Sequence, residues 1–159
     1  MDTKNTIAKF IEETRITDAN LDKCFQEQSS LRAYYGACSA QADLKYNRLK
    51  LQFDVQEAAL YKEVRERFTA MNVKSTEKMI ENEVKVDPRW QDLKGKVLDA
   101  ECEADVLKNL VMSLNDRRDM LIQCGADRRD ETKGQLRAME ILKGRDATRL
   151  NILNQQQPQ

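Results

Sequence analysis

Apolar residues recur at helical spacing along most of the chain and divide it into four segments. In the first segment, Ile7, Phe10 and Ile11 share one face, and the pattern weakens at residues 14–17, where β-branched side chains disfavour a helix. The second segment runs over about residues 17–71 without a proline. A helix of this length without a breaker is typical of a coiled coil.

A brief connecting helix is predicted within residues 72–86, where Ser75 or Thr76 can accept a hydrogen bond from a free amide of the first turn. Asp87-Pro88 predicts the start of a second long helix, because Asp caps a first turn and Pro has the φ angle of the first helical position. That helix has the strongest periodicity of the chain, in steps of four and three. Its seam consists of Leu93, Val97, Ala100, Ala104, Leu107, Val111, Leu114, Arg118 and Leu121.

Two glycines predict where the second long helix is interrupted. Gly125 stands where a helix can end or bend, and the helical pattern resumes beyond it until Gly144 closes it. The last residues are polar, so we expect a disordered tail over residues 151–159. Residues 1–150 are expected to form a single helical coiled-coil domain.

These segments together predict an all-α fold. Two long helices joined by a short connector can bury their seams within one chain if they form an antiparallel coiled-coil hairpin, with short flanking helices beside it. Tyr34, Trp90 and Leu110 lie off the main seams and would stay uncovered, which predicts a homo-oligomer. The residues expected to mediate this oligomerisation are Leu93, Val97, Leu107, Val111, Leu114 and Leu121.

The composition counts against a catalytic site. None of the 159 residues is a histidine, so histidine-based acid–base catalysis and histidine-ligated zinc are excluded. No G-x-x-x-x-G-K phosphate loop occurs. Glu101, Glu103 and Asp105 alternate along a helix and therefore point in different directions, not toward one metal ion. We predict a non-enzymatic protein with no metal and no other cofactor.

The expected location is the cytoplasm. No stretch approaches the ~20 apolar residues of a membrane span, and the N-terminus lacks the apolar core of a signal peptide. The cysteines lie far apart inside helical patterns, with neither metal-ligand spacing nor the clustering of a disulfide scaffold, which is typical of a reducing compartment. These cysteines are Cys24, Cys38, Cys102 and Cys124.

Charge balances over the whole chain, with 27 basic and 27 acidic residues, so any electrostatic site must be local. Basic side chains around the turn between the long helices are the better candidates for nucleic-acid contact, although an ordinary exposed hairpin tip explains them equally well. Arginine doublets further on could follow the phosphates of a single strand, but interleaved aspartates favour a solvated or intersubunit ion network. The candidate nucleic-acid-binding residues are Lys62, Arg65, Arg67, Lys74 and Lys78 at the turn, and Arg117, Arg118, Arg128 and Arg129 beyond it.

Aromatic residues recur along the predicted helices and have two possible roles. They could stack on bases, as in proteins that bind single strands. Packing against neighbouring helices is the more common role of such residues, and it is the role we expect. The residues are Tyr34, Tyr35, Tyr46, Phe53, Tyr61 and Trp90.

Several motifs follow one another in a distinctive order. The pair Tyr34-Tyr35 precedes RLKLQFDV at residues 48–55, then KSTEKMIENEVKVDPRWQDLKGKV from residue 74 and LKNLVMSLNDRRDMLIQCGADRRDE from residue 107. Over about residues 18–131 this order resembles the small helical phage proteins related to the UvsY-type recombination mediators. The resemblance implies a ring-like homo-oligomer without catalysis that binds single-stranded DNA in the host-cell cytoplasm. It would help to load a RecA-like recombinase past a single-strand-binding protein during DNA recombination and repair.

The resemblance also implies that DNA-contacting basic residues lie near the end of the first long helix, over residues 58–67. This chain departs from the family there, with Ala58 and Leu60 at positions that are basic in the family. Lys62, Arg65 and Arg67 could take over their role one turn later. The alternative, from a different functional class, is a coiled-coil protein–protein adaptor or phage assembly factor that binds no DNA.

Overall fold

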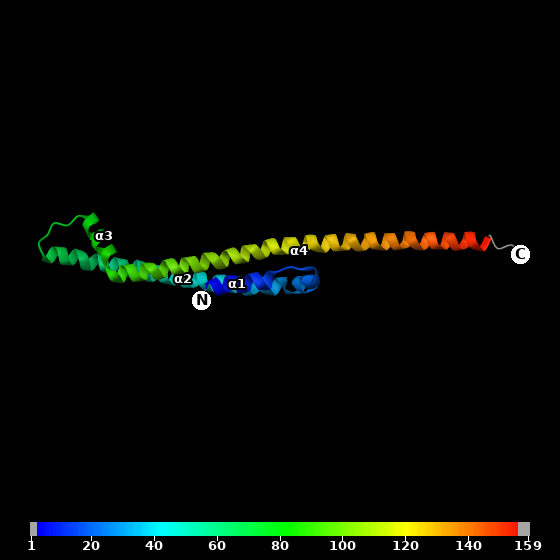
Figure 1. The fold of residues 1–159 in the computed structure, drawn as a ribbon. Coiled ribbons are helices and arrows are strands. Elements are labelled where there is room, and N and C mark those ends of the chain that lie inside the picture. The colour runs from blue at the N-terminus through cyan, green and yellow to red at the C-terminus, as the bar shows by residue number, and fades with distance from the viewer. Residues whose placement is uncertain (1–2, 156–159) are drawn as a thin grey trace. The chain divides into compact units, whose positions relative to one another are not determined.

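The structure, a computed structural model, describes the backbone of residues 3–155 and the side chains of residues 4–145. Within these residues every regular element is a helix, which confirms the predicted all-α class. The chain divides into two units, Met1–Asn115 and Asp116–Gln159. Its elements, labelled in Figure 1, are α1 (Thr3–Thr14), the 3₁₀ turn η1 (Asp18–Asn20), α2 (Leu21–Ala70), α3 (Glu77–Val86) and α4 (Pro88–Gln155).

The end of α2 is a Schellman motif. Asn72 has a φ of 53°, the left-handed conformation that asparagine tolerates better than most residues. The amide of Asn72 donates to the carbonyl of Thr69 (3.0 Å), and the amide of Val73 donates to that of Phe68 (3.1 Å). These bonds satisfy carbonyls that the last helical turn leaves free, so the chain turns sharply before α3 begins.

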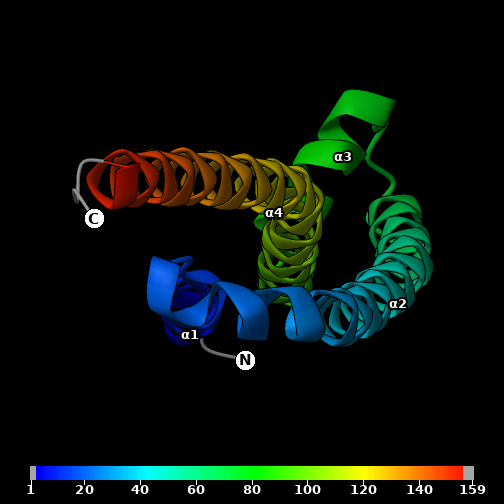
Figure 2. The ribbon, with the colours of Figure 1, turned by 90° about the vertical axis from the view of Figure 1, so that its right-hand side faces the viewer.

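The structure selects one of the two predicted caps of α3 and confirms the predicted cap of α4. The side chain of Thr76 accepts a hydrogen bond from the amide of Met79 (3.4 Å) at the start of α3. Asp87 Oδ1 accepts from the amide of Arg89 (2.8 Å), and Pro88 is the first residue of α4. Figure 2 shows α3 between the end of α2 and the start of α4.

The predicted interruption of the second long helix is wrong. α4 continues through Gly125 and Gly144 as far as Gln155. A glycine ends a helix when it adopts a positive φ, and no described glycine does so. The helix formers around each glycine offset its helical cost of about 1 kcal/mol. α4 thus includes the first part of the predicted tail, whereas residues 156–159 lie outside the described residues.

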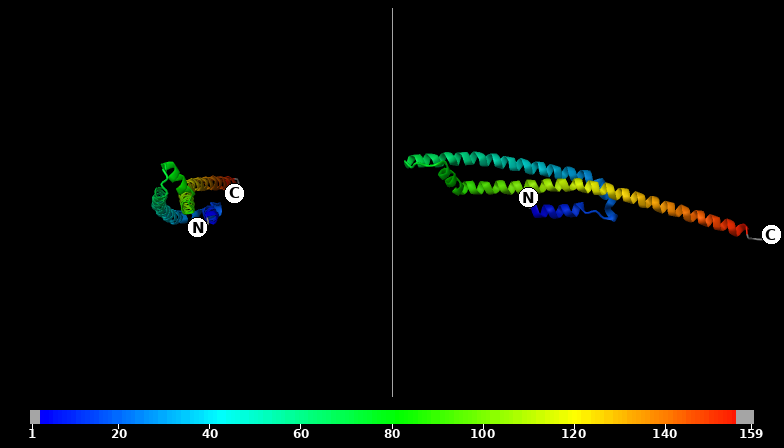
Figure 3. Two further views of the ribbon diagram at one scale, coloured as in Figure 1. Left: turned by 90° about the vertical axis from the view of Figure 1, so that its left-hand side faces the viewer. Right: turned by 90° about the horizontal axis from the view of Figure 1, so that it is seen from above.

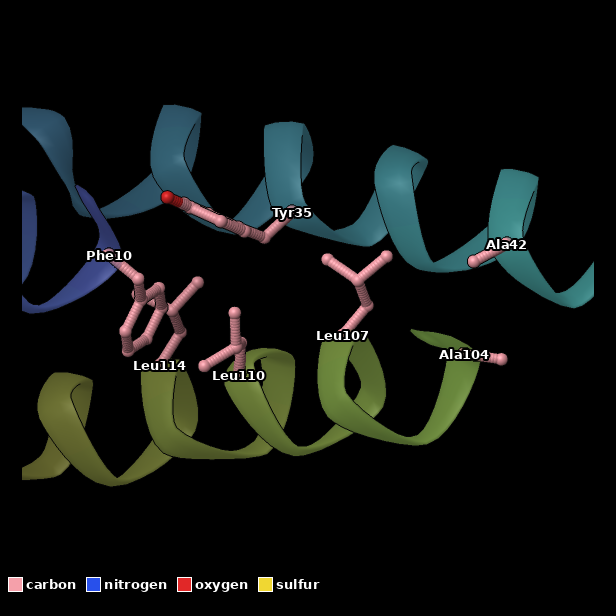
Figure 4. Packing of buried hydrophobic residues seen from close by; sticks show 7 residues of the cluster. All are labelled: Phe10, Tyr35, Ala42, Ala104, Leu107, Leu110 and Leu114. Atoms are coloured by element: carbon pink, nitrogen blue, oxygen red, sulfur yellow. The ribbon is translucent and has the colours of Figure 1, made fainter. Parts of the chain in front are cut away.

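The main core of unit 1 brings α1, α2 and the first part of α4 together; the three segments lie side by side in Figures 1 and 3. The ring of Phe10 meets that of Tyr35 edge-on, with centroids 5.0 Å apart. Leu107, Leu110 and Leu114 of α4 pack against these rings, as Figure 4 shows. The predicted leading helix therefore covers one end of the contact between the two long helices.

A second core cluster lies between α2 and α3. Leu60 and Val64 of α2 are buried against Ile80 and Val84 of α3. Tyr61, Phe68 and Trp90 are partly buried at its edges. A helix of 10 residues is not stable alone in water, so α3 depends on the packing of its apolar face against α2.

One part of the predicted seam on α4 is shifted. Leu110 and Arg117 are buried, whereas Val111 is half-buried and Arg118 is exposed. Residues three and four apart both share a helix face, and the buried pattern takes a step of three after Leu107 where the predicted seam takes a step of four. The buried stripe therefore passes through 107, 110, 114, 117 and 121, and the prediction of Arg118 as a seam residue is wrong.

Candidate functional site

Acidic residues of α3 pair with the basic residues at the end of α2. The guanidinium of Arg65 contacts the carboxylate of Glu77, which also accepts a hydrogen bond from the hydroxyl of Tyr61. Arg67 lies 3.5 Å from Glu83. The hydrogen bond from Tyr61, together with the charge of Arg65, holds the pKa of Glu77 below its ordinary range. The predicted basic surface is therefore partly neutralised by its own chain.

The remaining basic residues of this end are more open. Lys62 is exposed and pairs only loosely with Glu66, 3.9 Å away on the same helix. Lys74, in the turn after α2, and Lys78, in the first turn of α3, are exposed. Neither has an ion-pair partner among the residues that the structure describes. The turn between α2 and α3 thus keeps free positive charge.

Arg89 joins the end of α2 to the start of α4, a role that the sequence analysis missed. Its Nη2 lies 2.7 Å from Glu63 Oε2 and 3.0 Å from Asp87 Oδ2. The hydrogen bonds and charge of Arg89 lower the pKa of both Glu63 and Asp87. The position of Arg89, two residues after a capping aspartate, could have indicated its pairing with Asp87. Its other partner, Glu63, is 26 residues away, so no local pattern indicates that pair.

This pairing predicts a pH dependence. The pKa values of Glu63 and Asp87 are depressed below their ordinary 4.5 and 3.8. The stability that their pairing with Arg89 adds to the fold is therefore complete above those values and is lost as the pH falls through the folded pKa values. Acidification from about pH 6 to about pH 3 should therefore lower the Tm less in Arg89→Gln than in the unsubstituted chain. Thermal melts followed by circular dichroism measure this. Lys74→Gln removes an unpaired charge and serves as the control; equal losses of Tm in both variants would contradict the prediction.

The arginine doublets of α4 do not form a uniformly exposed row. Arg117 is only 5 % exposed, whereas Arg118 is exposed and lies 2.8 Å from Asp119. Arg128 and Arg129 are exposed. Three of the four predicted arginines therefore lie on the surface. Arg117 is buried and is poorly accessible to a phosphate.

The described aromatic residues are largely engaged in packing. Tyr35 is buried and its hydroxyl donates to Glu13 (2.9 Å); burial is the main cause of its raised pKa. The ring of Trp90 meets that of Phe53 edge-on, and its Nε1 donates to Glu57 (2.8 Å). These contacts agree with the packing role expected from the sequence.

The three acidic residues considered as metal ligands do not converge. Glu101 accepts a hydrogen bond from the hydroxyl of Tyr46 (3.1 Å), and Glu103 pairs with Lys45 (2.6 Å). Among the described residues no cluster of acidic or cysteine side chains is arranged to hold a metal ion. Glu101 and Glu103 instead connect α4 to α2.

Most residues predicted to mediate oligomerisation are covered within the chain itself. Val97, Leu107, Leu114 and Leu121 are buried, and Leu93 and Val111 are half-buried. A second copy would therefore find its apolar contacts elsewhere. The large apolar side chains that remain exposed include Leu44, Leu51 and Val55 on α2, and Met120, Ile122, Leu136, Met139, Ile141 and Leu142 on α4.

Comparisons with known proteins gave no relative. No family model matches the chain, and neither a curated protein nor a solved structure does. None of the described helices combines the length and apolar character that a membrane crossing requires.

Proposed function

We propose that this chain is a non-enzymatic recombination mediator of the UvsY type, which binds single-stranded DNA as a homo-oligomer and helps load a RecA-like recombinase past a single-strand-binding protein. It would act in the cytoplasm of the host cell. The observation that supports DNA binding is the exposed, unpaired charge of Lys74 and Lys78 at the turn between α2 and α3. The family itself is proposed from the order of the sequence motifs.

The proposed scaffold is an antiparallel coiled-coil hairpin of α2 and the first part of α4. Contacts between these helices occur in opposite order along the two segments. The side-chain amide of Gln28 donates to the carbonyl of Leu114 (2.6 Å), and Lys45 pairs with Glu103 (2.6 Å). Further along α2, Glu57 accepts from Trp90. This order supports a hairpin whose turn carries the basic residues at one end.

The turn favours contact with a phosphate backbone. Residues 62–78 contain five basic and three acidic side chains. The ion pairs of Arg65 and Arg67 are exposed, so water and salt screen them, and phosphates can compete with their carboxylates. Each copy contributes a weak site, and several copies in one oligomer would hold a strand by avidity.

A titration with fluorescently labelled oligothymidine tests this function. Fluorescence anisotropy is measured at about 50 and about 200 mM salt, where phosphate contacts differ strongly in strength. The double variant Lys74→Glu/Lys78→Glu should weaken binding by about tenfold or more and flatten the salt dependence. Lys50→Glu/Lys108→Glu makes the same change of charge at exposed sites on α2 and α4 and should have a smaller effect. Equal loss in both variants would argue against a site at the turn.

The alternative, an adaptor that binds no DNA, is favoured by a different observation. Leu136, Met139, Ile141 and Leu142 are exposed on one helix, as expected of a surface that binds another protein. An adaptor would give no salt-sensitive anisotropy signal with oligothymidine at any protein concentration. The same titration therefore separates the two functions.

A further inference from the structure

An open groove of about 630 Å³ lies between α2 and α3. Its lining includes Asp54 and Glu57 of α2 and Glu81 of α3, around the small apolar side chains of Ala58 and Val84. Lys85 also lines the groove and pairs loosely with Glu81, at 3.9 Å. The groove is thus acidic with an apolar floor, and it would repel a phosphate backbone.

The acidic groups of the groove are available for a partner. Asp54 is exposed and has neither a hydrogen bond nor an ion pair with the described residues. Glu57 is held in place by Trp90 Nε1, which leaves its second oxygen available as an acceptor. A partner with both basic and apolar side chains on one helical face would match this groove.

The second unit carries such a face. Arg129, Leu136 and Lys143 follow one another at intervals of seven residues along α4 and therefore share one side of the helix. Met139 lies beside Leu136 on the same side, and all four side chains are exposed. Arg129 and Lys143 have no ion pair among the described residues. This basic–apolar face has the opposite charge to the groove.

The segment that contains α3 is opposite in net charge to most of the second unit. Residues 76–105 contain nine acidic and five basic side chains, whereas residues 117–149 contain nine basic and six acidic. A neutral chain with separate acidic and basic segments is complementary to another copy of itself. This complementarity identifies the occupant of the groove as a second copy of the chain.

We infer that the α2–α3 groove of one copy binds the basic–apolar face of α4, around Arg129, Leu136 and Lys143, from a second copy. This inference rests on the homo-oligomer of the proposed function and assigns its contact surfaces. The two surfaces are different, so the contact is heterologous and repeats from copy to copy, closing into a ring or extending as a filament. Arg129 then serves assembly and not DNA binding.

A charge-swap experiment on the full chain tests the contact. Sedimentation velocity over a range of concentrations measures assembly of Asp54→Arg/Glu81→Arg and of Arg129→Glu/Lys143→Glu. Each pair of reversals should weaken self-association by about tenfold or more, and the combined four-site variant should recover it, because the opposite charges meet again. All four sites are exposed on helices, and circular dichroism confirms that each variant remains folded.

The matched control is Asp43→Arg/Asp105→Arg, which reverses two exposed aspartates outside the groove and should leave assembly unchanged. The inference would be overturned if the charge reversals left self-association unchanged, or if the four-site variant did not recover it. Oligothymidine titrations of the same variants report separately on the proposed function. A chain that assembles by charge swap but binds no DNA would refute DNA binding alone, and a DNA-binding oligomer unaffected by the reversals would refute only the groove contact.

Discussion

Leu114→Ala is expected to lower the free energy of unfolding of unit 1 by about 2–5 kcal/mol. The side chain of Leu114 has 0 % exposure and packs with Phe10 and Tyr35 where α1, α2 and α4 meet. Its truncation leaves a cavity that the rings cannot fill without giving up their edge-on contact. α1 has 12 residues and depends on this packing for its stability, so it should detach first.

Urea unfolding followed by circular dichroism measures this loss. Leu98→Ala makes the same chemical change on the same helix at an exposed position, and it should change the free energy of unfolding by no more than about 0.5 kcal/mol. Similar losses of unfolding free energy in the two variants would show that α1, α2 and α4 do not share a core around Leu114.

Features set by neighbouring residues were predictable from the sequence. Ser75 or Thr76, and Asp87, are predicted as caps because a capping side chain binds amides two or three residues away, and the structure selects Thr76 for α3. The four helical segments followed from periodicity in the same way. Gly125 shows the limit of such local signals, since a glycine permits a helix to end without requiring it.

Contacts between distant residues could not be predicted. Periodicity places Arg65 and Glu77 on helices but does not indicate that they meet across the turn, and it gave no partner for Arg89. Periodicity also placed Arg118 and not Arg117 on the seam, because a helix face accepts steps of three and of four residues and the pattern does not show which step the packing takes. The sequence therefore indicates where basic residues gather along the chain, while their pairing with the carboxylates of α3 required the structure.

The position of α3 controls that neutralisation, and Ile80→Ala tests it. Ile80 is buried against Leu60 and Val64, so the substitution should destabilise the docking of α3 by about 2–5 kcal/mol. α3 is too short to persist alone and should unfold locally. Hydrogen exchange should show lost protection of amides 77–86, with protection retained in the middle of α2.

Local unfolding of α3 has a consequence for DNA binding. Glu77 and Glu83, which pair with Arg65 and Arg67, would no longer be held against them. If the turn contacts single-stranded DNA, the affinity of Ile80→Ala for oligothymidine should rise at low salt, because freed arginines are available to phosphates. Met79→Ala, at an exposed position of the same helix, should change neither exchange nor affinity. A fall in affinity that accompanies the loss of α3 protection would mean that the docked helix itself forms part of the DNA-binding surface.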